Sequence, residues 1–140
     1  MKENYLIEIR GTQEMDGELE EISLSTRGHF ARRGANYYIT YKESAATGYE
    51  GCTTTLKVEG TKKVTMMRYG ALDTRMIVEA GRRNQFHYNT DAGSMLFGVS
   101  AHEIQTEFGG EGGKVKFSYT LDLNARTISN NEVLVQVRPC

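Results

Sequence analysis

The chain has 140 residues, of which 17 are Lys or Arg and 18 are Asp or Glu, so its formal net charge at pH 7 is -1. This balance argues against a dedicated nucleic-acid-binding protein, for which a strongly basic domain is expected. The length suits one domain and allows about two-thirds of the unfolded chain's surface to be buried, so one sizeable core is possible.

The first ten residues, MKENYLIEIR, carry several charges and lack the apolar stretch that a secretory signal requires. No later segment has the length and apolar composition of a membrane-spanning helix. We therefore expect a soluble cytoplasmic protein without a membrane partner. In such a reducing compartment the two cysteines, Cys52 and Cys140, are expected to be thiols rather than a disulfide.

Alternating apolar residues predict β-strands from the start of the chain. Tyr5, Ile7 and Ile9 share one face of a first strand, and the same phase resumes in a second strand after Asp16-Gly17. Asp-Gly between alternating runs is a strong hairpin signal, because both turn positions must accept a positive φ. Further strands are predicted around residues 37–41, 54–58, 64–68, 76–79, 86–90, 95–108, 115–123 and 133–137.

Two glycine-rich or irregular points interrupt this regular pattern. The apolar phase shifts within residues 95–108, which predicts a β-bulge near His102. Residues 109–113, Gly-Gly-Glu-Gly-Gly, are predicted to form a flexible hairpin loop. This loop lacks the Lys-Ser/Thr pair and the following helix of a phosphate-binding loop, so a nucleotide site is not expected there.

About ten strands with short connections and no amphipathic helix indicate an all-β fold, either a sandwich or a barrel. Closure is favoured because it removes the exposed edges of a long sheet. The prediction is one domain over residues 1–140, a closed or nearly closed antiparallel β-barrel of about 8–10 strands.

Several spaced motifs resemble the bacterial YwiB-like family of unknown function. They occur in the order Tyr37-Tyr38-Ile39-x-Tyr41, Thr54-Thr55-Leu56-Lys57-Val58, Arg68-x-Gly70, Tyr88-x-Thr90-x-x-Gly93 and Gly113-x-Val115-x-Phe117-x-Tyr119-x-Leu121. The resemblance implies a calycin-type barrel, related in shape to lipocalins and fatty-acid-binding proteins, and supplies no established substrate or reaction. One departure is Asp91-Ala92, where family members often have a proline and an aromatic residue.

Two charged residues fall on the apolar face that should point inward. Glu43 follows Tyr41 in phase, and Arg68 follows Met66. An unpaired buried charge costs several kcal/mol, so each is expected to have a partner. One interpretation is a structural or solvated pair at the barrel's mouth. The other is that Arg68 anchors the carboxylate of an acidic apolar ligand.

Three tyrosines, Tyr41, Tyr88 and Tyr119, together with Thr90, fall on the same inferred inner face. Each brings a hydroxyl that is expected to be hydrogen-bonded when buried. They are candidates for the polar end of a ligand cavity. The alternative is that they simply fill the core, because barrels of about eight strands have interiors that side chains nearly fill.

Metal, cofactor and catalytic sites have little support in the sequence. His29 and His87 are out of phase with the inner face and His102 is at the bulge, so the three are expected to face solvent. No cofactor is predicted, and no acid, base or nucleophile constellation is visible. The basic turn residues are expected to be ordinary surface, with a basic rim as the alternative; they are Lys62, Lys63, Arg75, Arg82 and Arg83.

Our leading hypothesis from the sequence is a barrel that binds a small apolar or amphipathic, acidic ligand close to Arg68, Glu43, Tyr41, Tyr88 and Tyr119. The alternative is a non-catalytic interaction protein or homodimer with a filled core, and an enzyme ranks third. For the alternative, apolar residues out of phase with the core would supply the contact surface. They are Leu6, Tyr38, Met67, Tyr69, Ile77 and Leu134.

Overall fold

The computed structural model describes residues 4–71, 73–90 and 93–140, with the side chains of residues 89 and 90 left aside. Its elements are β1 (Tyr5–Met15), β2 (Glu18–Arg33), β3 (Asn36–Lys42), the 3₁₀ helix η1 (Ala45–Thr47), β4 (Cys52–Glu59), β5 (Lys63–Gly70), β6 (Thr74–Glu79), β7 (Arg83–Thr90), β8 (Gly93–Gly109), β9 (Gly112–Leu123) and β10 (Arg126–Pro139).

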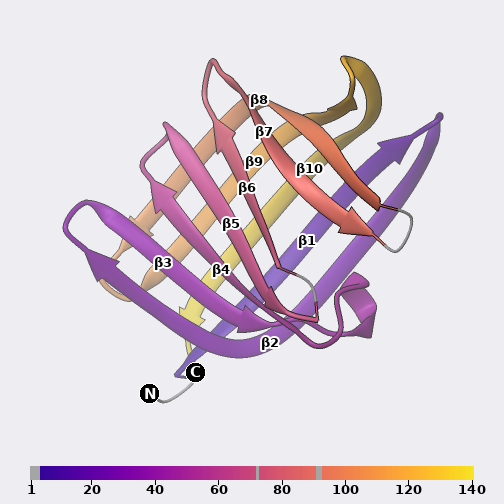
Figure 1. Cartoon of the computed structure of the whole chain (residues 1–140). Coiled ribbons are helices and arrows are strands. Elements are labelled where there is room, and N and C mark those ends of the chain that lie inside the picture. The colour runs from indigo at the N-terminus through magenta and orange to yellow at the C-terminus, as the bar shows by residue number, and fades with distance from the viewer. Residues whose placement is uncertain (1–3, 72, 91–92) are drawn as a thin grey trace.

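The ten strands form one antiparallel sheet that curls into a nearly closed barrel (Figure 1). Strands that are consecutive in sequence pair with each other, and β10 pairs with β1. In the described part of the chain the exception is β6 and β7, which are the two edges of the sheet and lie beside each other without a ladder. Asn84 Nδ2 donates to Glu79 Oε1 across this seam at 3.2 Å. The prediction of an all-β, nearly closed barrel is confirmed.

Alternation of side chains between the two faces of each strand separates the interior from solvent. In β4 the residues Cys52, Thr54, Leu56 and Val58 are buried, and those between them are only half-buried. A one-residue slip would move this entire set to the outer face, so the hydrophobic pattern fixes the register.

The predicted hairpin and bulge are both present. Asp16 and Gly17 have φ values of 53° and 81°, as the tight turn between β1 and β2 requires. The β8–β9 register shifts between Ala101 and Glu103, which places the bulge at His102.

The prediction of a loop over residues 109–113 was wrong in its extent. Gly109 pairs with Gly112, so the two strands continue into the glycine run and only residues 110 and 111 form the turn. A Cβ at Gly113 would clash with the backbone of Glu107, so glycine is needed there for close approach of the chains. The predicted turn at Asp91-Ala92 lies outside the described residues.

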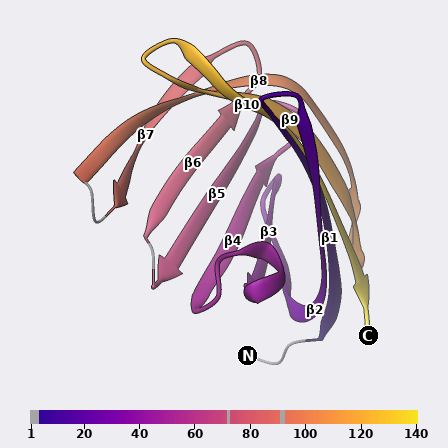
Figure 2. The ribbon, with the colours of Figure 1, turned by 90° about the vertical axis from the view of Figure 1, so that its right-hand side faces the viewer.

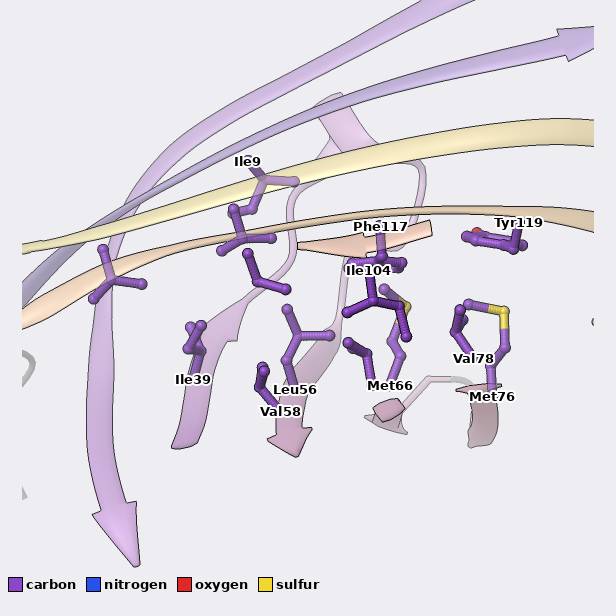
Figure 3. Packing of buried hydrophobic residues seen from close by; sticks show 14 of the residues in the cluster. Ile9, Ile39, Leu56, Val58, Met66, Met76, Val78, Ile104, Phe117 and Tyr119 are labelled. Atoms are coloured by element: carbon purple, nitrogen blue, oxygen red, sulfur yellow. The ribbon is translucent and has the colours of Figure 1, made fainter. Parts of the chain in front are cut away.

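The half of the barrel interior near the termini is packed with apolar side chains. Figure 3 shows part of the buried cluster, in which Ile9, Met66, Met76 and Tyr119 also line the cavity in the other half. Phe117, Ile39 and Leu56 are among the largest fully buried residues and come from β9, β3 and β4. Beyond them, four partly buried aromatic rings gather at the end of the barrel near the termini. Tyr37 stacks on Phe108 at 4.9 Å and on Phe30 at 5.7 Å, and Phe30 also contacts Tyr5 at 5.3 Å. These four rings pack against the buried core.

No helix in the described residues is long and apolar enough to span a membrane. Cys52 is buried and Cys140 is exposed, and they are thiols rather than a disulfide, as predicted.

Candidate ligand-binding cavity

The other half of the barrel encloses a cavity of about 680 Å³. Residues of the β1–β2 hairpin and of η1, in the β3–β4 connection, line its opening. In Figure 2 this end of the barrel faces the viewer. This volume is within the range of small-molecule sites in proteins. Two of the candidate tyrosines, Tyr41 and Tyr119, belong to the buried core as well as to the cavity wall.

Five of the candidate residues line this cavity together. Tyr41 and Glu43 come from β3 and the residue after it, Arg68 from β5, Tyr88 from β7 and Tyr119 from β9. They are brought together because they occupy inward positions at the same end of their strands. The side chain of Thr90, the sixth candidate, lies outside the described part of the structure.

Glu43 is the most buried charged side chain at this site, with 1% of it exposed. Its Oε2 accepts hydrogen bonds from Thr54 Oγ1 at 2.5 Å and from Arg68 Nε at 3.2 Å. Its Oε1 accepts from Thr47 Oγ1 at 2.8 Å. Both carboxylate oxygens of this buried side chain therefore have hydrogen-bond donors, as a buried polar group requires. The predicted pairing of Glu43 with Arg68 is present.

Arg68 is held from two directions and is 16% exposed. Its Nε donates to Glu43, and its guanidinium lies over the ring of Tyr49, with Cζ 3.8 Å from the ring centroid. This stacking is favourable because the ring face is electron-rich. Among the described residues, no acceptor is hydrogen-bonded to the two terminal nitrogens of Arg68, which lines the cavity.

Two of the tyrosines are buried and remain protonated at neutral pH. Burial raises the pKa of Tyr41 above its ordinary value, and the negative charge of Glu43 adds to that rise. Burial also raises the pKa of Tyr119 to about 12, against a small opposing effect of the Arg68 charge. Both phenols are therefore neutral hydroxyls that can donate a hydrogen bond. Tyr88 is half-buried on the cavity wall.

The remainder of the wall combines apolar and polar residues. Phe86 and Phe97 stack at 5.6 Å, and Tyr88 meets Phe97 edge to face at 6.0 Å. These rings come from β7 and β8, next to the seam with β6. Other apolar side chains from the surrounding strands complete the wall, namely Ile9, Ile22, Met66, Met76, Leu121 and Val133. Other polar residues also line the cavity, and three of them are acidic: Glu20, Glu21 and Glu132. The cavity is thus amphipathic, with the Arg68–Glu43 pair, further acidic residues and an apolar part of the wall.

Three contributors to the polar end were not predicted as site residues: Thr47, Tyr49 and Thr54. Thr54 is in phase with the buried residues of β4, so the alternating pattern of that strand was sufficient to predict that it points inward. Thr47 and Tyr49 belong to the connection after β3, for which no periodic pattern exists. Their contacts with Glu43 and Arg68 arise only from the folded path of that connection.

The histidines and the basic turn residues lie elsewhere. His87 and His102 are exposed, and His102 Nε2 is hydrogen-bonded to Thr120 Oγ1 at 2.5 Å on the outer face. Within the described residues no group of three His, Cys, Asp or Glu side chains is placed to hold a metal ion. Of the basic turn residues, Lys63, Arg82 and Arg83 each pair with an acidic residue.

Comparison with solved structures supports the architecture. The crystal structure of ywiB protein from Bacillus subtilis matches with a TM-score of 0.82 and 21% sequence identity. The match covers 100% of this chain and 95% of that one. At this identity the likeness establishes the fold.

Comparison with functionally curated proteins gives no match. A profile of one protein family, described as Domain of unknown function (DUF1934), matches residues 7–135. That range includes nearly all of the barrel, and the resemblance seen in the sequence motifs is confirmed. The chain belongs to the DUF1934 family, the YwiB-like proteins of unknown function.

Proposed function

We propose that the barrel binds a small amphipathic molecule that carries a carboxylate. The observation that carries this proposal is the orientation of Arg68, whose Nε is bonded to Glu43 while its terminal nitrogens have no partner among the described residues. A planar guanidinium presents parallel N–H groups that match the two oxygens of a carboxylate.

The apolar wall supplies the second part of the proposal. Burial of ligand carbons stabilises a complex by about 25 cal/mol per Å² of apolar surface removed from water. The stacked Phe86 and Phe97 and the two methionines, Met66 and Met76, offer a surface for such carbons. Methionine side chains adapt to different shapes, so the wall suits a chain or ring of variable outline.

The net charge of the cavity wall does not by itself favour an anion, because Glu43 balances Arg68 and three further acidic residues, Glu20, Glu21 and Glu132, also line the cavity. The preference for a carboxylate would come from hydrogen bonds of the terminal Arg68 nitrogens and from the Tyr119 hydroxyl, which also lines the cavity. Charge-assisted hydrogen bonds contribute about 1.5–3 kcal/mol each. The proposal includes a cytoplasmic location and a calycin-like mode of binding inside the barrel.

A homodimer formed through the outer face is the second candidate. It is favoured by Tyr69, which is 49% exposed on the outer side of β5. The other apolar residues predicted to face outward are each half-buried; they are Leu6, Tyr38, Met67, Ile77 and Leu134. This surface is less apolar than an obligate dimer interface requires, so we rank it below ligand binding.

Native mass spectrometry of gently purified protein tests both candidates in one experiment. Release of a stoichiometric compound on denaturation, with a carboxylate in its fragmentation pattern, is the expected result. A concentration-dependent dimer with nothing bound would overturn the binding proposal in favour of the second candidate. A probe titration with cis-parinaric acid, a fluorescent fatty acid, then measures affinity in the unliganded protein.

A further inference from the structure

Residues 44–51 cross the open end of the barrel between β3 and β4. Within them, Ala45, Ala46 and Gly48 are exposed, while Thr47 and Tyr49 are half-buried. The segment lines the cavity from residue 45 to residue 49, and η1 also lies against β2. Figure 2 shows η1 in front of the space that the strands surround. This segment therefore covers part of the cavity opening.

Two side-chain contacts hold the middle of this segment to the barrel wall. Thr47 Oγ1 donates to Glu43 Oε1 at 2.8 Å, and the ring of Tyr49 lies 3.8 Å from Arg68 Cζ. Both partners belong to the polar pair at the proposed site. The segment and the ligand-facing guanidinium are thus positioned by the same four side chains.

The remaining fixed points are at the two ends of the segment. Ser44 Oγ accepts from Ala46 N at 3.2 Å at the start of η1. At the other end Cys52 N donates to Tyr49 O at 3.0 Å, and Glu43 N donates to Cys52 O at 2.9 Å. Gly48 has a φ of 83°, a left-handed conformation in which glycine is unstrained. The segment is thus anchored by backbone hydrogen bonds at its ends and held in its middle by the two side-chain contacts of Thr47 and Tyr49.

We propose that residues 44–51 form a strap that closes the cavity. The contacts of Thr47 with Glu43 and of Tyr49 with Arg68 hold the strap in its closed position. Lifting Tyr49 off Arg68 and Thr47 off Glu43 opens the path for a ligand, and re-forming both contacts retains it. Tyr49 is also a positioning residue, because its ring restrains the plane of the Arg68 guanidinium. This inference rests on the proposed function of the cavity as a binding site.

Cys52 gives a readout of strap opening that needs no ligand. It is 4% exposed although it is the first residue of β4, immediately after the strap. In a Cys140→Ser background, its rate of modification by Ellman's reagent reports how often this end of the barrel opens. A cation–π contact of this kind changes an equilibrium by up to about 30-fold. We expect Tyr49→Ala to raise the Cys52 modification rate about tenfold.

Tyr69→Ala is the matched control, because Tyr69 is an exposed tyrosine on the outer face whose hydroxyl contacts Met67. It should leave the Cys52 rate unchanged. Thr47→Val, which keeps the side chain's shape and removes its hydroxyl, should raise the rate in the same direction and serves if Tyr49→Ala does not fold. Denaturant unfolding of each variant excludes global opening as the cause. Unchanged Cys52 rates in both strap variants would overturn the strap.

Stopped-flow mixing with cis-parinaric acid separates the strap from the binding proposal. If the strap controls access, Tyr49→Ala and Thr47→Val increase both the association and the dissociation rate of the probe. If the probe binds wild-type protein and both rates are unchanged in the variants, the strap is wrong while the site stands. If the probe binds neither protein but the Cys52 rates rise, the segment opens as inferred and the carboxylate-binding function fails.

Discussion

Arg83 and Asp122 form a bidentate ion pair across β8, the strand between those that carry them. Arg83 in β7 donates from Nε to Asp122 Oδ2 at 2.9 Å and from Nη2 to Oδ1 at 2.6 Å, while Asp122 lies in β9. Gly98 of β8 lies between them, opposite Asp122 in the ladder. Asp122 Oδ1 also accepts from Ala125 N at 3.2 Å. The pair therefore ties an edge strand of the barrel to the turn between β9 and β10.

Gly98 is required for this pair, because a Cβ at residue 98 would clash with the Arg83 guanidinium. Gly98→Ala should displace Arg83 from Asp122 and lower the free energy of unfolding. Asp122→Asn removes the same interaction, so the double variant should be less destabilised than the sum of the two single changes. Urea unfolding of the three variants measures this coupling. Additive losses would show that Gly98 and the ion pair act independently.

Acidification should weaken the ion pair between Arg83 and Asp122. The hydrogen bonds from Arg83 hold the pKa of Asp122 below its ordinary value, ahead of a smaller opposing effect of desolvation. The folded state therefore binds a proton less readily than the unfolded state. The stabilisation is present above the ordinary aspartate pKa, about 4, and is lost as pH falls through the lower folded value. Unfolding of wild-type and Asp122→Asn protein from pH 7 to pH 2 should show a stability difference that shrinks in this window. A constant difference would contradict it.

The packed and hollow halves of the barrel should respond differently to loss of a ring. Phe117 is 1% exposed in the packed half, and Phe97 is half-buried on the cavity wall. Phe117→Ala should cost about 3–5 kcal/mol because it creates a new internal cavity. Phe97→Ala enlarges a space that already exists and should cost about 1–2 kcal/mol. Chemical denaturation measures the free energy of unfolding of both variants. Equal losses of stability would argue that side chains fill the cavity in solution.

The architecture was largely predictable because it depends on local patterns. Alternating residues such as Leu56 and Val58 fix which face of a strand is buried, and Asp16-Gly17 fixes a turn. The inward position of Glu43 and Arg68 followed from the same phase, and from their charges the need for a partner could be inferred. Strands that follow one another in the sequence usually pair in the sheet, which predicts most of the strand order.

The strap and the cavity were not predictable because they depend on contacts between distant segments. Residues 44–51 have no apolar periodicity, so nothing in them indicates that Tyr49 covers Arg68. Whether inward side chains fill a barrel depends on its diameter and on which positions hold small residues such as Gly11. The open seam between β6 and β7 is likewise a property of the whole sheet rather than of either strand.

Opposite effects on ligand affinity are expected from the two members of the polar pair. Arg68→Gln should weaken binding of a fluorescent fatty acid about 10- to 100-fold, the loss expected for a charge-assisted hydrogen bond, and leave its methyl ester unaffected. Glu43→Gln keeps acceptors for the neighbouring hydroxyls but leaves Arg68 with an unbalanced charge. It should strengthen acid binding while lowering stability by about 1–3 kcal/mol. Titration of acid and ester against both variants checks this. Equal losses for acid and ester would show that Arg68 is only structural.

Filling the cavity from Gly11 gives the most direct test of where a ligand lies. Gly11 is on the cavity wall, and a Cβ there would be 3.8 Å from Glu132 O and 4.0 Å from Ile22 Cβ, which are ordinary contact distances. Gly11→Leu therefore places side-chain atoms inside the cavity, and so reduces its free volume, without removing a contact. Because glycine weakens the interior of a strand, stability should be unchanged or rise by about 0.5–1 kcal/mol.

Gly11→Ala is the matched control, since it changes the backbone preference in the same direction and adds only one methyl group. Affinity for cis-parinaric acid, measured by fluorescence titration, should fall at least about tenfold in Gly11→Leu and little in Gly11→Ala, because only the larger side chain occupies the space of ligand carbons. If both variants bind as wild type does, the probe lies outside the barrel. The affinity for a ligand bound to the outer face would not change when a side chain is added inside the barrel.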